Sequence, residues 1–190
     1  MKKEKLITIL GPTASGKTEL GVYLAKKLGS SVISGDAFQV YKGMDIGTAK
    51  VTPEEAQGVT HYLVDALDAT EPYSAAIFQE KAKSYITEEN KKSKIPILVG
   101  GTGLYIQGLL EGYTFLPEVK KSGKWHSLYQ EKGKEALLEQ LSGKVAAEKI
   151  PQDPQRMIRQ LGLIEEGYSL ESGKSGELLY DGPVIGITMD

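Results

Sequence analysis

The sequence predicts an α/β fold, in which a parallel sheet is flanked by helices and carries a mainly helical insertion. Compact apolar runs of strand length alternate with helical patterns over the first 116 residues. After about residue 116 the strand signals stop and helical patterns continue, until one more apolar run comes near the end of the chain. Alternating strands and helices are typical of a parallel sheet that is covered on both faces.

The individual elements follow from the apolar runs and the residues that interrupt them. The run KLITIL at 5–10 is rich in β-branched residues and predicts a buried strand. Leucines at every fourth position from Leu20 to Leu28 predict a helix that starts near Lys17 and ends at Gly29. Further strands are expected at 31–34, 61–65, 95–99 and 183–189, and further helices from Thr52, from Ser74 to about Asn90, after 100–103, at 133–141 and at 153–164.

The expected division has an α/β core at 1–116, a helical insertion at 117–181 and a strand at 182–190 that returns to the core. The polar, Gly- and Ser-rich stretch at 165–182 is expected to be a loop. The sequence stops just past an apparent sheet strand, where a doubly wound domain usually continues with a covering helix. The rest of the core is therefore expected to be missing, which makes the chain a truncated form.

The composition excludes several classes of protein. A chain of 190 residues with 40% hydrophobic residues can build a sizeable core. It has no cysteine, which excludes disulfide scaffolds and cysteine-based zinc sites. No stretch approaches the roughly 18 apolar residues of a membrane span. The net charge of −2 excludes a global attraction to nucleic acid but leaves room for a local basic patch. We expect a monomeric cytoplasmic protein.

A phosphate-binding loop follows the first expected strand. Residues 11–18, GPTASGKT, match G-x-x-x-x-G-K-[ST] in full, with a strand before and a helix after. Such a loop wraps an anion with backbone N–H groups at a helix N-terminus, and this predicts a core like that of the P-loop NTPases. Lys17 adds a mobile charge, and Thr18 offers a hydroxyl to Mg²⁺. The expected phosphate-binding residues are Gly11, Pro12, Thr13, Ala14, Ser15, Gly16, Lys17 and Thr18.

Two polar residues follow other strands and have more than one interpretation. Asp36 ends the second strand and is expected near the phosphate loop, because strand carboxyl ends line the ligand crevice of open α/β sheets. It is either a turn residue that binds its own backbone or a functional acid. As an acid it would hold Mg²⁺ or take a proton from a hydroxyl or an amine. Thr102, in the Gly-rich turn after 95–99, either caps the next helix or reaches the ligand.

Two aromatic positions receive a structural interpretation. His61 lies in a strand pattern without a second metal ligand nearby, so we interpret it as structural. Trp125 lies in a Lys-rich stretch and is either a stacking platform for RNA or a packing anchor, and we favour the anchor.

Five segments, taken in order, resemble the tRNA dimethylallyltransferases. They are GPTASGKT, ISGDAFQVYKGMDIGTAK, GVTHYLVD, ILVGGTGLY and DPQRMIR. The resemblance is close over residues 5–115 and patchy over 116–190, and the run from Asp36 to Lys50 is its most specific part. The family continues with helices after the strand that VIGITMD matches, in agreement with a truncated chain.

The resemblance implies transfer of a dimethylallyl group from dimethylallyl pyrophosphate to the exocyclic amine of the adenosine adjacent to the tRNA anticodon. The loop would hold the pyrophosphate, with Mg²⁺ on Thr18. Asp36 would be the catalytic base, and Lys17 and Thr102 would be further catalytic residues. The partners are tRNA, through its anticodon stem-loop, and the prenyl ester. The residues expected to contact tRNA are Asp36, Ala37, Phe38, Gln39, Thr102, Gln155, Arg156, Met157, Ile158 and Arg159, the last five within the helical insertion.

Two other functions compete with prenyl transfer. A small-molecule or nucleotide kinase would bind a triphosphate under an Arg-rich lid, whereas Arg156 and Arg159 are the only arginines in the chain. A truncated phosphate-binding domain would bind its ligand without turnover. The identity of the ligand and the presence of turnover separate the three.

Overall fold

The chain forms two compact units, residues 1–114 with 173–190, and residues 115–172. The computed structural model describes residues 3–117, 119–120, 122–170, 173 and 177–188. The second unit ends at 172, earlier than the expected boundary at 181. The later residues belong to the first unit because they run alongside its first strand, where Asp181 forms a parallel bridge with Lys5.

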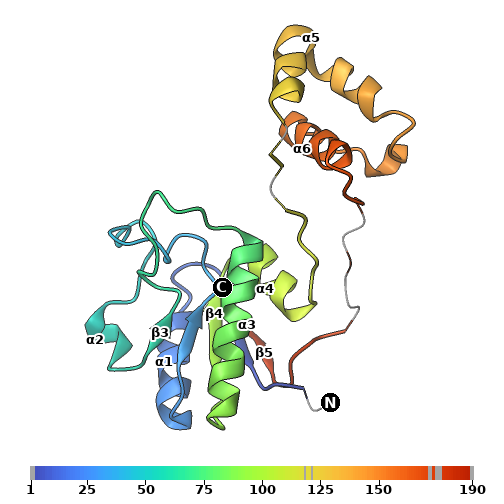
Figure 1. The fold of residues 1–190 in the computed structure, drawn as a ribbon. Coiled ribbons are helices and arrows are strands. Elements are labelled where there is room, and N and C mark those ends of the chain that lie inside the picture. The colour runs from blue at the N-terminus through green and yellow to red at the C-terminus, as the bar shows by residue number, and fades with distance from the viewer. Residues whose placement is uncertain (1–2, 118, 121, 171–172, 174–176, 189–190) are drawn as a thin grey trace. The chain divides into compact units, whose positions relative to one another are not determined.

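The first unit is an α/β domain, as the sequence predicted (Figure 1). Its elements are β1 (Ile7–Leu10), α1 (Lys17–Leu28), β2 (Val32–Ser34), α2 (Pro53–Ala56), β3 (His61–Tyr62), α3 (Ala75–Lys91), β4 (Ile97–Gly100), α4 (Gly103–Leu110) and β5 (Val184–Gly186). The strands form one sheet in the order β3-β2-β4-β1-β5, and all four neighbouring pairs are parallel.

Side-chain alternation along the strands assigns the helices to the two faces of the sheet. Ile9, Val32 and Val99 point to the face that α1 covers, where they form one apolar cluster with Ala25. Residues of the opposite parity, such as Ile33 and Leu98, pack against α3 and α4. Both faces are therefore buried, which explains why the strands read as continuous apolar runs.

All five strands are shorter than predicted, and the difference is largest for β3 and β5. The strand expected at 61–65 ends at Tyr62, because Leu63 and Asp65 adopt positive φ angles of 62° and 50° that leave the extended conformation. The strand expected at 183–189 spans Val184–Gly186, and Met189 lies outside the described residues.

The helix caps predicted at Thr52 and Ser74 are present. Thr52 and Glu55 form a reciprocal capping box at the start of α2, and the Ser74 hydroxyl accepts a hydrogen bond from Ile77 N of α3. None of the helices in the described ranges is both long and apolar enough to cross a membrane.

The second unit is helical and has its own core. It contains α5 (Gly123–Leu141), the short 3₁₀ helix η1 (Ala147–Lys149) and α6 (Pro154–Glu165). Gly133, at φ 77°, breaks α5 into two helical segments. Only the segment after Gly133 was predicted. Trp125 lies in the earlier one, where it is buried and its Nε1 donates to Glu165, as expected for a packing anchor.

Candidate functional site

The phosphate loop lies between β1 and α1, at the carboxyl end of the sheet. Gly16 is the N-cap of α1 in a left-handed conformation, φ 81°, and no side chain among the described residues caps the helix there. Ala14 also has a positive φ, 63°. The first backbone N–H groups of α1 thus remain available to an anion, which the helix dipole also favours.

Lys17 is the mobile charge of this loop. Its ammonium donates to the carbonyl of Pro12, so that it folds back over the loop. Burial lowers the pKa of Lys17, and the nearby Asp36 carboxylate opposes this by favouring the charged form. In the same loop the Ser15 hydroxyl is buried without a partner among the described residues.

Asp36 is both a turn residue and a pocket residue. Its Oδ1 accepts hydrogen bonds from the backbone N–H groups of Phe38, at 2.8 Å, and Gln39, at 3.3 Å. Its Oδ2 has no partner within the described part of the chain, and the side chain lines the same pocket as Lys17. The turn orients the carboxylate and leaves one oxygen for a ligand, so the two interpretations of Asp36 are compatible.

Thr102 occupies the N-cap position of α4, but its hydroxyl does not cap that helix. Instead, Thr102 Oγ1 accepts from the backbone N–H of Ala37 at 3.2 Å. This bond ties the turn after Asp36 to the start of α4. Thr102 supports the turn from behind and does not itself line the pocket, whereas Gly100 and Gly101 do.

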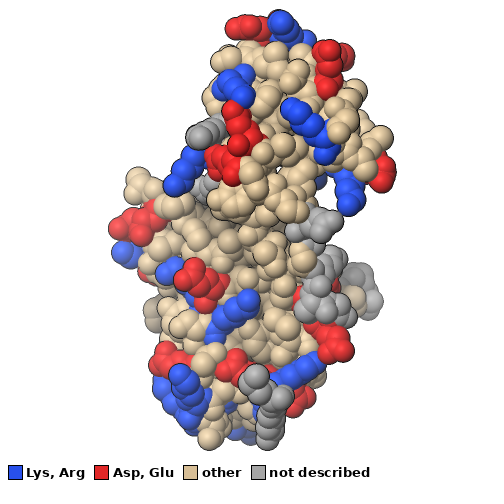
Figure 2. All heavy atoms as spheres, turned by 45° about the vertical axis from the view of Figure 1, so that its right-hand side comes forward, with Lys and Arg blue, Asp and Glu red and all other residues tan. Residues whose placement is uncertain are grey.

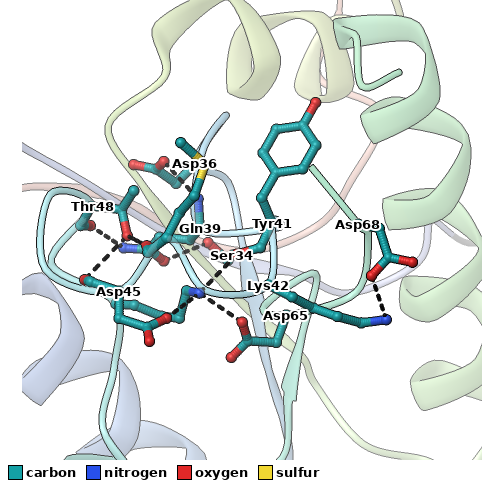
Figure 3. A network of polar contacts seen from close by, with 11 residues as sticks. Ser34, Asp36, Gln39, Tyr41, Lys42, Asp45, Thr48, Asp65 and Asp68 are labelled. Carbon is teal, nitrogen blue, oxygen red and sulfur yellow. Dashed lines mark hydrogen bonds and ion pairs between the residues drawn. The ribbon is translucent and has the colours of Figure 1, made fainter. Parts of the chain in front are cut away.

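Gln39 connects the end of β2 to the segment 43–50, which we call the wall segment (Figure 3). Its Oε1 accepts from the Ser34 hydroxyl at 2.9 Å. Its Nε2 donates to the carbonyls of Thr48, at 3.1 Å, and Ala49, at 3.3 Å. Both amide protons are used within the protein, which leaves Gln39 one oxygen lone pair for a ligand.

These elements surround one pocket at the carboxyl ends of the neighbouring strands β1, β4 and β2, the usual ligand position in open α/β sheets. Phosphate-loop residues, the Asp36 carboxylate, the wall segment and several valines contribute to it. The lining residues are Thr13, Ala14, Lys17, Thr18, Val32, Ser34, Asp36, Gln39, Thr48, Ala49, Val51, His61, Val99, Gly100 and Gly101.

His61 is one of several lining residues that the sequence interpretation did not place in the site, since it was interpreted as structural. Its Nδ1 bonds the carbonyl of Val59 at 2.9 Å, and its Nε2 is buried without a partner among the described residues. Burial lowers the pKa of His61, and the bond to Val59 only partly opposes this. The ring is therefore held neutral, with Nδ1 as donor and Nε2 as acceptor. Its pairing opposite Val32, below the end of β2, could have indicated this position.

The expected RNA segment of the second unit is divided by burial. Gln155, Arg156 and Arg159 are exposed on α6, and the Arg159 guanidinium donates to the carbonyl of Leu116 at 2.9 Å. The side chains of Met157 and Ile158 are buried in the core of the unit. Met157 and Ile158 are therefore core residues, and their helical spacing on the apolar face of α6 explains it.

Charges are mixed on the face of the molecule that Figure 2 shows. Basic and acidic side chains are interspersed among uncharged residues there, in keeping with the net charge of −2. Contact with a polyanion on this face would depend on particular residues and not on a broad basic field.

Comparison with known proteins relates this chain to one family. The model of a family described as IPP transferase matches residues 39–183. A tRNA dimethylallyltransferase of Carboxydothermus hydrogenoformans is 46% identical over 198 residues, which cover 98% of this chain and 64% of the relative. One of Bacillus subtilis is 40% identical over 198 residues, covering 99% and 63%.

Solved structures give the same relationship. The full-length tRNA isopentenylpyrophosphate transferase of Bacillus halodurans matches with a TM-score of 0.65 and 41% identity, over 99% of this chain and 61% of that one. A eukaryotic dimethylallyltransferase acting on tRNA matches with a TM-score of 0.78 and 26% identity, over 98% and 49%. The chain thus spans 62–64% of the length of the first curated relatives that it matches.

Proposed function

The chain belongs to the IPP transferase family, and on that premise we propose that the whole protein transfers a dimethylallyl group to tRNA. The donor is dimethylallyl diphosphate, and the acceptor is the exocyclic amine of the adenosine adjacent to the anticodon. The observation that carries this proposal is the composition of the pocket. A phosphate loop, a carboxylate and an apolar wall share one small space, and an allylic diphosphate beside an amine needs these three surfaces.

The diphosphate fits the phosphate-loop side of the pocket. The free N–H groups at the start of α1 and the Lys17 ammonium can bind its oxygens, as charge-assisted hydrogen bonds. The valines Val32, Val51 and Val99 and the methyl group of Ala49 offer the five-carbon chain an apolar surface. A nucleotide kinase has no need of such a surface beside its acid.

The oxygen donors present fit Mg²⁺. Mg²⁺ in phosphate sites is bound by one or two protein oxygens together with the substrate phosphates and water. The Thr18 hydroxyl, which lines the pocket, supplies an oxygen of this kind. When bound, the ion would stabilise the negative charge of the departing diphosphate.

Asp36 is suited to the amine. Because its Oδ1 is held by the turn, Oδ2 can accept a proton from the adenine amino group, whose lone pair is weakly nucleophilic. As the nitrogen–carbon bond forms, the allylic carbon–oxygen bond breaks and its electron pair leaves with the diphosphate. The proton released by the nitrogen passes to Asp36, and the loop N–H groups and Lys17 stabilise the leaving group.

Recognition of tRNA needs more than the pocket. The target base has to leave its stack to reach Asp36, which calls for contacts that hold the anticodon loop. Gln155, Arg156 and Arg159 are exposed and available for RNA phosphates or bases. Because tRNA is the substrate, we place the protein in the cytoplasm. We also propose that it is a monomer.

Ligand binding and product formation test this proposal together. The chain is incubated with Mg²⁺ and either dimethylallyl diphosphate or ATP, and the shift of the thermal midpoint is measured for the wild type and Asp36→Asn. We expect the prenyl ester to stabilise both, since the phosphate loop is unchanged in the variant. Anticodon stem-loop RNA is then added, and its mass is measured by mass spectrometry. We expect a dimethylallyl adduct with the wild type, and we expect Asp36→Asn to form this adduct at least about 100-fold more slowly.

The outcomes separate the transferase from the kinase. Stabilisation by the prenyl ester together with a prenylated RNA supports the transferase. Stabilisation by ATP alone, with no mass added to the RNA, would overturn it in favour of a kinase.

A further inference from the structure

Lys50 is a buried charge that lies directly behind the pocket. Its neighbours in sequence, Ala49 and Val51, both line the pocket, whereas Lys50 does not. Its side chain is only 4% exposed. The anchor of the Lys50 side chain therefore sets the position of the backbone on either side of it, and with it the position of Ala49 and Val51 in the pocket.

The anchor of Lys50 is complete. Its ammonium donates to Asp45 Oδ1 and to Asp65 Oδ1, each at 2.6 Å, and to the carbonyl of Tyr41 at 2.8 Å (Figure 3 labels these three partners). An ammonium has three protons, and all three are used. Burial by itself lowers the pKa of Lys50, but the hydrogen bonds and charges of Asp45 and Asp65 outweigh it and raise the pKa above its ordinary value.

The wall segment has no apolar anchor of its own. Residues 43–47 and Ala49 are exposed, and the large side chains of Met44 and Ile46 point to solvent, with Ile46 98% exposed. Lys50 is the buried residue of this segment. Beyond its own turn bonds, the segment is held by polar contacts at its carboxyl-terminal end, where the Gln39 amide donates to the carbonyls of Thr48 and Ala49 and the Lys50 ammonium is anchored.

The backbone beside Lys50 is also in a conformation that needs support. Ala49 has a φ of 46°, in the left-handed region that an alanine seldom adopts. Such a conformation persists when the surrounding contacts over-determine it. Here the carbonyl of Ala49 accepts from Gln39, and the next residue is the clamped Lys50.

We propose that Lys50 is a positioning residue, which holds Ala49 and Val51 in place as the wall for the prenyl group of the donor. This role rests on the proposed function. Lys50 acts through Asp45, Asp65 and the backbone, and touches neither the diphosphate nor the reacting atoms. Its loss should therefore weaken contact with the five-carbon chain and spare contact with the diphosphate.

The test compares two ligands that differ only in the prenyl group. With Mg²⁺ present, Kd is measured by calorimetry for inorganic pyrophosphate and for dimethylallyl diphosphate, on the wild type and on Lys50→Met, which keeps an apolar stem and removes the charge. We expect Kd for pyrophosphate to change less than about twofold and Kd for the prenyl ester to rise about tenfold, the effect of losing a few apolar contacts.

Matched variants separate positioning from general stability. Lys42→Met removes an exposed ion pair with Asp68, at 3.0 Å, next to the same wall segment, and should leave both constants unchanged. Lys50→Arg keeps a positive donor and should restore part of the preference for the prenyl ester. Asp45→Asn loosens the clamp from its exposed side, where the carboxylate is 67% exposed, and should raise Kd for the prenyl ester about threefold.

Three outcomes would overturn the role of Lys50. One is an unchanged ratio of the two Kd values in Lys50→Met, and another is an equal loss for both ligands in Lys50→Met and Asp45→Asn. If Lys50→Met does not fold, an unchanged ratio in Asp45→Asn decides against the proposal. A wild type that binds pyrophosphate as tightly as the prenyl ester would instead overturn the proposed function and this inference with it.

Discussion

The two sides of the pocket are built in different ways. The phosphate loop at 11–18 is held by backbone geometry, with a left-handed Gly16 and the first turn of α1. The wall segment at 43–50 has turns but neither a helix, a strand nor an apolar anchor, and polar contacts of Lys50 with Asp65 and of Gln39 with two of its carbonyls tie it to the rest of the unit. One side follows from a local sequence pattern, whereas the other depends on tertiary polar contacts.

This difference predicts where each side is sensitive to substitution. Most side-chain substitutions leave the backbone N–H donors of the phosphate loop in place. The loop is therefore sensitive to substitution only at Lys17, its one charge, and at glycines that allow close backbone approach. The wall segment fails when a buried donor or charge is lost, because its carbonyls and carboxylates then remain unpaired.

Loss of the loop charge should have the largest effect on binding. Lys17→Met leaves the backbone N–H groups in place but removes the ammonium that lines the pocket. We expect pyrophosphate to bind about 100-fold more weakly, since a hydrogen bond between charged groups contributes about 1.5–3 kcal/mol. Calorimetry measures this, with Lys26→Met in the last turn of the same helix as control. Equal affinities in the two variants would contradict the assignment of Lys17.

Gly100→Ala tests the close approach of backbone between the ends of β4 and β2, below the pocket residue Asp36. A Cβ at Gly100 would lie 2.5 Å from the carbonyl oxygen of Gly35, the residue before Asp36. Backbone cannot move aside as a flexible side chain can, so we expect the free energy of unfolding to fall by about 1–3 kcal/mol. Chemical denaturation measures this. Gly103→Ala is the control, because a Cβ there meets nothing within 4 Å and should be neutral.

Gln39→Glu should loosen the wall segment at the two residues that precede Lys50. The carboxylate can still accept from Ser34, but it cannot donate to the carbonyls of Thr48 and Ala49. We expect a loss of about 1–2 kcal/mol of stability and about tenfold in kcat/KM for prenyl transfer. Ser34→Ala removes one hydrogen bond and keeps both amide donors, so its effect should be smaller. A larger loss in Ser34→Ala would argue against this order of importance.

Much of the fold could be predicted because local rules specify it. Strand-length apolar runs, the capping box at Thr52 and the cap at Ser74 all act within a few residues. The segment of α5 before Gly133 escaped prediction because its few apolar residues, Trp125, Leu128 and Tyr129, lie among polar and charged ones. Trp125 and Leu128 lie three residues apart on one face and are packed in the core, a spacing that could have indicated a helix.

The site was predictable on its phosphate side and not on its wall. Asp36 and Lys17 follow from their positions after strands, and the structure brings both into one pocket. Nothing in the sequence around Lys50 shows that it is buried, because its partner Asp65 reaches it through a left-handed turn after β3. Likewise, the strand pattern at His61 could not show that the ring lines the pocket and that its Nε2 is buried without a partner among the described residues.

The smallest predicted effect is that of His61 on the pH dependence of stability. Its pKa in the folded chain is lowered from 6.5, so the unfolded chain takes up a proton first as the pH falls. The stability that the neutral ring contributes is therefore present above pH 6.5 and is lost below it. We expect His61→Asn, which keeps a donor to Val59 but does not titrate, to flatten the decline in stability between pH 7 and 5 by less than about 1 kcal/mol. Thermal denaturation across this range measures it, with His126→Asn as the exposed control. If only the His126 variant flattened the decline, the buried ring would not be the group that makes stability depend on pH.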